Sequence, residues 1–88
     1  MPEIQLTEYF EKRYGKLPPE IQKKTRKALR LLAEDLRHPG LRSKPIEGAP
    51  GIFEARVDQD YRMTFERLDG DVLLMRVVGK HDKTIKNP

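Results

Sequence analysis

The spacing of hydrophobic residues changes once along the chain, from helical intervals in the first half to alternation in the second. After Pro19, apolar or small residues recur at intervals of three and four, namely Ile21, Thr25, Ala28, Leu29, Leu32 and Leu36. This spacing places them on one stripe of a helix whose opposite face carries lysines and arginines. Pro19 suits the first turn, where the missing N–H costs nothing. An amphipathic helix is predicted from residue 19 to about residue 37.

Two short elements are predicted before this helix and one long loop after it. Residues 3–6 alternate polar and apolar, as a short strand does. Thr7 can cap a helix over residues 8–14, and Gly15 can end it. Residues 38–51, HPGLRSKPIEGAPG, contain three prolines and three glycines and predict a loop. Loops of this length in small domains are functional or mobile.

The remainder of the chain predicts three strands. Residues 52–58 and 61–68 alternate, whereas residues 72–78 are nearly all apolar, as in a strand inside a sheet. The order predicts an α+β fold: a short N-terminal strand, a two-helix hairpin and a three-stranded antiparallel meander. We expect a single domain over residues 1–88, with helices on one sheet face and the other face open.

Strand register decides which side chains share the open face. If residues 58–60 form the first loop, the apolar faces of the two strands coincide and Arg56 pairs with Arg62. A three-residue second loop, residues 68–70, then places Tyr61 opposite Val77 and adds Arg76 to the same row. A two-residue Asp-Gly turn is the alternative, but it would put Arg76 on the helix-covered face.

Such a row of arginines has two interpretations. Like charges that face each other in a sheet are destabilising, so folding would not favour the row unless an anion binds there. Alternatively, Glu54 and Glu66 on the same face neutralise it as a surface lattice of ion pairs. The sequence leaves both interpretations open.

Composition narrows the function classes. The chain has 88 residues, a net charge of +4 and no cysteine, which excludes disulfides and thiolate metal sites. The positive charge favours a polyanionic or acidic partner. No segment approaches the roughly 18 to 20 apolar residues of a membrane span, so we expect a cytoplasmic protein. His38 and His81 lack metal-ligand spacing, and no metal or other cofactor is expected. His38 suits the end of the long helix as a cation.

The whole chain, in its order of strand, two helices and three-stranded meander, resembles a known family, and stretches of the C-terminal half carry the match. A loop ending in PG leads into IFEARV, then QDYRMTF, then an apolar strand that closes as VVGKHD. This order resembles the RelE/ParE superfamily of type II toxin–antitoxin toxins, and the VGKHD ending favours the RelE-like mRNA interferase branch. The resemblance implies a metal-independent endoribonuclease that cuts mRNA in the 30S A site of the ribosome through attack by the 2′-OH. It also implies inhibition by a cognate antitoxin protein.

The resemblance assigns roles to individual residues. Arg62 matches the phosphate-clamping arginine, Arg56 a basic residue of the preceding strand, and His81 the position after the last strand, which makes these three the expected catalytic residues. Arginine grips phosphate bidentately, and histidine exchanges protons near neutral pH. The expected RNA-binding residues are Lys44, Arg42, Arg76, Lys80 and Lys83.

One departure from the family pattern leaves a second function open. Many active relatives carry an aromatic residue near the C-terminus, but KHDKTIKNP after Gly79 contains none. The chemistry then rests on His81, with Lys80, Asp82 or Lys83 as helpers. The alternative is a catalytically weak or silent toxin that blocks translation or DNA gyrase without cutting RNA. A basic scaffold protein is a third possibility.

Overall fold

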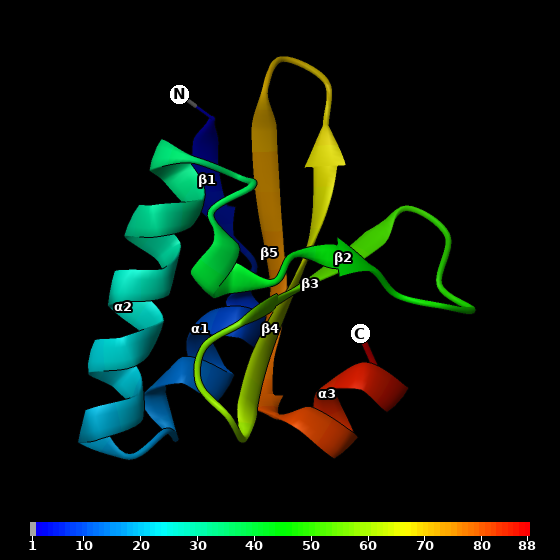
Figure 1. Ribbon diagram of the computed structural model, residues 1–88. Helices are drawn as coiled ribbons and strands as arrows, with labels where there is room; N and C mark the ends of the chain where they lie inside the picture. The colour runs from blue at the N-terminus through cyan, green and yellow to red at the C-terminus, as the bar shows by residue number, and fades with distance from the viewer. Residues whose placement is uncertain (1) are drawn as a thin grey trace.

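The computed structural model describes residues 2–88 as a curved mixed sheet with helices on both faces (Figure 1). The elements in chain order are β1 (Glu3–Leu6), α1 (Glu8–Gly15), α2 (Pro19–Glu34), the 3₁₀ helix η1 (Pro39–Leu41), β2 (Lys44–Pro45), β3 (Ile52–Arg56), β4 (Tyr61–Leu68), β5 (Val72–Lys80) and α3 (His81–Lys86). The strand order is β1-β5-β4-β3-β2, with β1 parallel to β5 and the other pairs antiparallel. The predicted α+β class and element order are confirmed.

Local sequence signals explain the helix starts. The Oγ1 of Thr7 accepts a hydrogen bond from the backbone N–H of Phe10 at 3.0 Å and caps α1. The Thr7 hydroxyl also donates to the carbonyl oxygen of Arg76 at 3.0 Å, which ties this cap to β5. Pro19 occupies the first turn of α2 as predicted. These contacts fix α1 and the α1–α2 turn beside the last strand.

The core lies between α2, α1 and one face of the sheet. The stripe of α2 buries Ile21, Thr25, Ala28 and Leu32, and α1 adds Phe10, which is fully buried. Facing them are Met63, Phe65 and Met75 from β4 and β5. The predicted helical stripe is thus confirmed as the buried face of α2 as far as Leu32, whereas Leu36 lies beyond the end of the helix.

The segment after α2 is more ordered than the sequence indicates. The helix ends at Glu34 instead of about residue 37, and residues 38–51 contain η1 and β2 instead of loop alone. Nδ1 of His38 accepts a hydrogen bond from the N–H of Gly40 at 3.1 Å and caps η1. Lys44 pairs with Glu54, which adds a fifth strand to the sheet. Proline and glycine content alone could not reveal these pairings.

The first meander register is confirmed, and the second is wrong. Ala55 pairs with Met63 and Arg56 with Arg62. In the second hairpin, however, Leu68 pairs with Val72, so the loop is residues 69–71. Gly70 and Asp71 adopt positive φ values of 80° and 59° there, a conformation that glycine and aspartate tolerate.

A β-bulge moves the rest of β5 further out of the predicted register. Phe65 pairs with Met75 but Thr64 pairs with Val77, so Arg76 is the extra residue. Beyond the bulge Arg62 pairs with Gly79 instead of Arg76. The predicted row of three arginines is therefore wrong, because Arg76 lies three residues along β5 from Arg62's partner.

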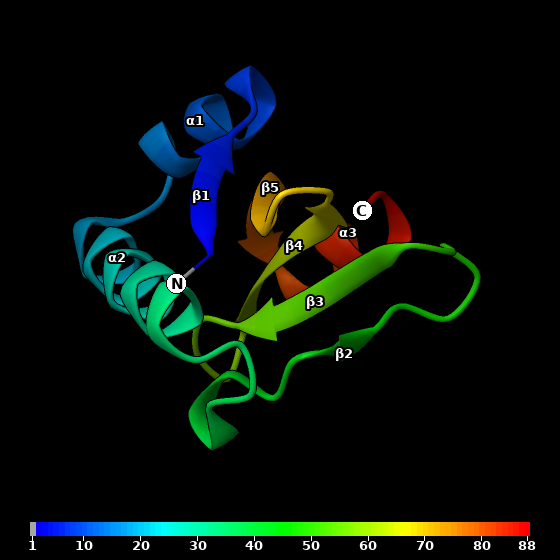
Figure 2. The same ribbon diagram turned by 90° about the horizontal axis from the view of Figure 1, so that it is seen from above.

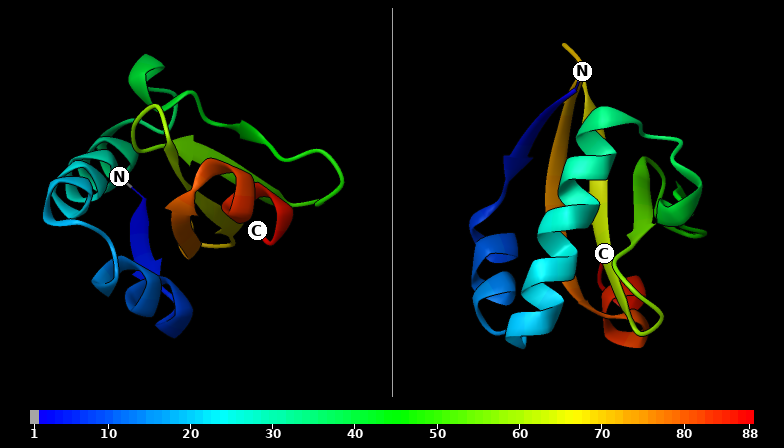
Figure 3. Two further views of the ribbon diagram at one scale, coloured as in Figure 1. Left: turned by 90° about the horizontal axis from the view of Figure 1, so that it is seen from below. Right: turned by 60° about the vertical axis from the view of Figure 1, so that its left-hand side comes forward.

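The second sheet face is not open. Residues 81–86 form α3, which lies on the opposite side of the sheet from α2 (Figures 2 and 3). Thr84 of α3 and Thr64 beneath it are both buried. Thr64 and Arg76 also donate hydrogen bonds of 3.0 Å to the backbone oxygen of Pro88. The C-terminal segment is thus packed on the sheet.

Candidate functional site

His81 lies at the rim of an open hollow of about 450 Å³, here called the histidine hollow. Its lining residues are Gln59, Asp60, Tyr61, Lys80, His81 and Asp82, from the β3–β4 turn and the junction of β5 with α3. The backbone N–H of His81 donates to the carbonyl oxygen of Asp60 at 2.8 Å. This bond fixes where the histidine leaves the sheet. The imidazole is 47% exposed, and its Nδ1 lies 3.3 Å from Oδ1 of Asp82.

The register brings an aromatic residue to this histidine. Tyr61 begins β4 and pairs with Lys80, the residue immediately before His81. The sequence predicted Val77 as its partner, and the difference of three residues arises from the loop shift and the bulge. The C-terminal segment KHDKTIKNP contains no aromatic residue, but Tyr61 of β4 supplies one in the same hollow as His81.

A second hollow adjoins the first, and it is strongly basic. This basic hollow, of about 190 Å³, lies between the α1–α2 turn and α3 and shares Tyr61 and Lys80 with the histidine hollow. Its charged lining residues are all cations: Arg13, Lys16, Lys80 and Lys83. A Cβ atom on Gly79 would lie 3.0 Å from Oγ1 of Thr84 and 3.4 Å from Nη2 of Arg13, so the glycine leaves room for the Thr84 hydroxyl, and the Arg13 guanidinium lies close to this backbone. Four cations around so small a space suit a phosphate group.

Arg62 holds the turn beside the histidine hollow. Its Nη1 donates to the carbonyl oxygens of Asp58, Gln59 and Tyr61, and its Nε lies 3.8 Å from Oε1 of Glu54. The Arg62 side chain is 17% exposed and that of Glu54 9%. This guanidinium is therefore mostly committed to contacts within the protein.

Asp58 organises the same turn from the other side. Its Oδ1 accepts hydrogen bonds of 2.9 Å from the N–H groups of Asp60 and Tyr61, while Oδ2 lies 3.3 Å from Nζ of Lys24. Burial alone would raise the pKa of Asp58, but the hydrogen bonds and Lys24 outweigh it and lower the pKa below the ordinary 3.8. The charged form is therefore favoured by folding.

We expect Asp58→Asn to lower the free energy of unfolding by about 1 kcal/mol at pH 7, because the ion pair and the charge-assisted bonds are lost. A carboxylate whose pKa is lowered by folding stabilises the protein at pH values above its ordinary pKa. This contribution is lost as the pH falls through the pKa of the folded state. The difference between wild type and variant should therefore shrink below pH 3.8. Urea unfolding at several pH values measures this difference in the free energy of unfolding. A difference that does not change with pH would contradict the stabilising role of the Asp58 carboxylate.

The remaining predicted site residues lie outside the two hollows, except for Lys80 and Lys83. Arg56 lines a separate hollow with Lys24 and Lys27 of α2. Arg76 binds Glu66 at 2.8 Å. Arg42 and Lys44 lie beside η1 and on the edge strand β2. The Arg76–Glu66 and Arg62–Glu54 pairs favour the interpretation in which glutamates on the same sheet face neutralise the arginines.

The three expected catalytic residues are not brought into one hollow. Arg56 and Arg62 face each other across β3 and β4, but neither lines the histidine hollow. Within residues 2–88, no group of three or more histidine, cysteine or acidic side chains is arranged to hold a metal ion. In the same residues no helix has the length and apolar character needed to cross a membrane.

Sequence reasoning missed three residues of this region: Arg13, Lys16 and Tyr61. Arg13 and Lys16 lie near the end of α1, far from the C-terminus in sequence, and no motif links them to His81. Correct placement of both the second loop and the bulge in β5 would have revealed Tyr61.

No protein-family model matches the sequence, and comparison with curated proteins gives no match. Solved structures do match. The E. coli RelE toxin superposes with a TM-score of 0.72 at 22% identity, over 91% of this chain and 84% of that one. YafQ from E. coli strain BL21(DE3) gives 0.72 at 20% identity, over 94% and 97%. RelE of the archaeal RelE–RelB complex from Pyrococcus horikoshii OT3 gives 0.73 at 16% identity, over 90% and 93%. The chain has the fold of these proteins.

Proposed function

We propose that this protein, which has the fold of the RelE toxin, is the toxin of a type II toxin–antitoxin system and an endoribonuclease that cuts mRNA in the ribosomal A site. The observation that carries the proposal is the exposed imidazole of His81 beside Tyr61 and next to the basic hollow. Several solved structures of this fold are complexes with antitoxins. We therefore propose a cognate antitoxin, the ribosome and mRNA as partners.

The chemistry needs two proton transfers and a site for negative charge. The 2′-OH loses its proton and forms a bond to phosphorus, while the bond from phosphorus to the 5′ oxygen breaks and that oxygen takes up a proton. His81 performs one transfer. The Tyr61 hydroxyl and the carboxylates of Asp60 and Asp82 line the same hollow and are the available groups for the other. No step requires a metal ion or other cofactor.

The cationic residues form two groups, those that line the histidine and basic hollows and those that lie outside both. Lys80 lines both hollows and, with Lys83, Arg13 and Lys16, would stabilise the charge on the cut phosphate and its neighbour. Arg62 acts as a positioning residue, because it holds the turn whose Asp60 carbonyl anchors His81. Arg42, Lys44, Arg56 and Arg76 lie outside the hollows and would contact only a longer RNA or the ribosome.

We expect Arg13→Gln to weaken the binding of a short single-stranded RNA similarly for all base sequences, because it removes a phosphate contact. The slope of log K against log salt should become shallower by about 0.7, the value for one phosphate of a single strand. Fluorescence anisotropy at several salt concentrations measures this. Lys12→Gln on the same helix, outside both hollows, is the matched control, and an equal change in both variants would refute a specific role for Arg13.

The test of the proposed activity is in vitro translation of a defined message, with the 5′ ends mapped by primer extension. New ends within codons that appear only during translation support the proposal. Stalled translation or inhibited gyrase without new ends would instead support a binding toxin. The separation of Arg56 and Arg62 from the histidine hollow is the observation that favours this second function.

A further inference from the structure

Two hydrogen-bond donors on the sheet converge on one oxygen atom of the C-terminal segment. The hydroxyl of Thr64 and Nε of Arg76 each donate a hydrogen bond of 3.0 Å to the backbone oxygen of Pro88. Thr64 is fully buried, whereas the Arg76 side chain is 40% exposed. A hydroxyl and a guanidinium that meet at one oxygen atom also match an oxygen atom of a phosphate group.

The bulge in β5 determines where Arg76 lies. Arg76 is the extra residue between Met75 and Val77, and both of these neighbours are buried. Its carbonyl oxygen accepts a hydrogen bond of 3.0 Å from the Thr7 hydroxyl, which ties the bulge to the start of α1. Bulges re-aim side chains, often next to functional sites. Here the extra residue brings a guanidinium to the same acceptor as the buried hydroxyl of Thr64.

Arg76 retains donors for a ligand. Of the five N–H donors of an arginine, the one on Nε bonds to Pro88 and one on Nη1 bonds to Oε1 of Glu66 at 2.8 Å. Nη2 makes no hydrogen bond within residues 2–88. The guanidinium can therefore bind a phosphate group without releasing Glu66.

An open hollow of about 320 Å³ adjoins these donors, and we call it the tyrosine hollow. It is lined by the start of α1, by β5 and by the C-terminal segment, through Thr7, Tyr9, Arg76, Val77, Asn87 and Pro88. Tyr9 is 56% exposed, and its ring takes no part in the one stacked aromatic pair found among the described residues. A free aromatic face near a guanidinium suits a nucleotide, because the base stacks while the phosphate pairs with the cation.

We propose that Tyr9, Thr64 and Arg76 form a nucleotide-binding site that residues 87–88 occupy as an internal ligand. When a nucleotide binds, its phosphate replaces the oxygen of Pro88 and its base stacks on Tyr9. The nucleotide can be free or part of an RNA chain, since both carry these groups. The tyrosine hollow shares no residue with the histidine or basic hollow, and nucleotide binding requires no cleavage, so the inference does not depend on the proposed activity.

The internal ligand makes nucleotide affinity depend on how firmly the C-terminal segment is held. A site that is open for only a fraction of the molecules binds its ligand more weakly by that fraction. Asn87→Gly raises the entropy of the released segment, so it should tighten nucleotide binding by about two- to fivefold. Unchanged or weaker binding by this variant would contradict the role of residues 87–88 as an internal ligand.

The probe is adenosine 3′-monophosphate, titrated into the ¹⁵N-labelled protein and followed by NMR. We expect saturable shifts of the amides of Tyr9, Arg76 and Asn87. Adenosine should bind about tenfold more weakly, because it lacks the charge-assisted hydrogen bonds of the phosphate. Inorganic phosphate that shifts these amides at the same concentration as the nucleotide would overturn the proposal, since the base would then contribute nothing. The dipeptide acetyl-Glu-Glu-amide acting at a lower concentration would overturn it in favour of a protein partner.

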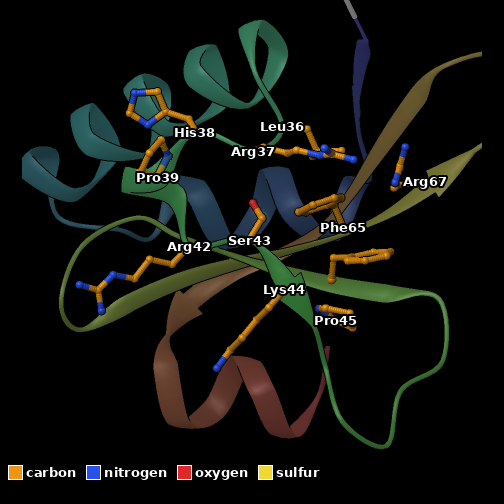
Figure 4. Close-up of a pocket in the computed structure, with 11 residues that line it drawn as sticks. Leu36, Arg37, His38, Pro39, Arg42, Ser43, Lys44, Pro45, Phe65 and Arg67 are labelled. Carbon is orange, nitrogen blue, oxygen red and sulfur yellow. The ribbon is translucent and has the colours of Figure 1, made fainter.

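Variants separate this site from general charge effects. Tyr9→Ala should weaken nucleotide binding about fivefold or more, the lower limit for one stacked base. The exposed position of Tyr9 means that this variant should keep the fold. Arg76→Gln should also weaken binding severalfold. Arg67→Gln removes the same charge beside a separate hollow, near Phe65 and the segment after α2 (Figure 4), and should bind as the wild type does. Equal loss in the Arg67 variant would overturn the proposal.

A tetraribonucleotide distinguishes the two sources of the nucleotide. If it shifts the same amides at lower concentration than the mononucleotide, the ligand is part of an RNA chain. Tighter binding of the mononucleotide identifies a free nucleotide as the ligand. If neither probe gives saturable shifts of these amides, the proposal is wrong.

Discussion

His81→Ala is expected to reduce codon cleavage by about 10²- to 10⁴-fold, the usual contribution of one positioned acid or base. The imidazole lies in the histidine hollow, next to Tyr61 and Lys80, and is accessible to a substrate. Its backbone N–H bond to Asp60 does not need the side chain, so the variant should keep the fold. Cleavage rates on programmed ribosomes measure the effect.

Two controls accompany this variant. His81→Gln keeps a polar side chain but cannot exchange protons, so it should be as slow as His81→Ala. Lys86→Ala removes a charge from the last turn of the same helix, outside both hollows, and should retain wild-type rates. Cleavage by His81→Gln close to the wild-type rate would show that proton transfer by this residue is not required.

Arg62→Ala is expected to lower the free energy of unfolding by about 3 kcal/mol. The turn carbonyls of Asp58, Gln59 and Tyr61 lose a charged donor, worth about 1.5 to 3 kcal/mol. Glu54, whose side chain is 9% exposed, also loses its cationic neighbour, and an unpaired buried charge is costly. Chemical denaturation at pH 7 measures the change.

Arg56→Ala is the matched control for this prediction. Arg56 is directly opposite Arg62 on the neighbouring strand. Removing one of two facing like charges should leave stability unchanged or raise it by a few tenths of a kcal/mol. If Arg62→Ala were as stable as wild type yet defective in RNA binding, Arg62 would be a substrate ligand instead of a positioning residue.

The sequence predicts the parts of this fold that depend on local pattern. The stripe of α2 follows from intervals of three and four, and the odd first loop follows from matching the apolar faces of β3 and β4. The pairing of Arg56 with Arg62 was therefore predictable. The contacts of Arg62 were not predictable, because the carboxylate of Glu54 and three turn carbonyls decide how this side chain is used.

The candidate site was predicted only in part, because β5 carries little information about register. VLLMRVV is nearly all apolar, so no alternation marks the bulge at Arg76. That bulge and the loop shift place Tyr61 beside Lys80 instead of Val77. The approach of Arg13 to Gly79 depends on tertiary packing of α1 against β5, and no sequence spacing encodes it.

Cleavage through the 2′-OH can be measured on ribosomes programmed with two messages. One carries ribose at the A-site codon, and the other carries a 2′-O-methyl group on each of its nucleotides. We predict that the wild-type protein cuts the first message, leaving a 2′,3′-cyclic phosphate and a 5′-OH end, and leaves the second intact. Equal cutting of both messages would exclude the 2′-OH as nucleophile, and no cutting of either would contradict the proposed activity.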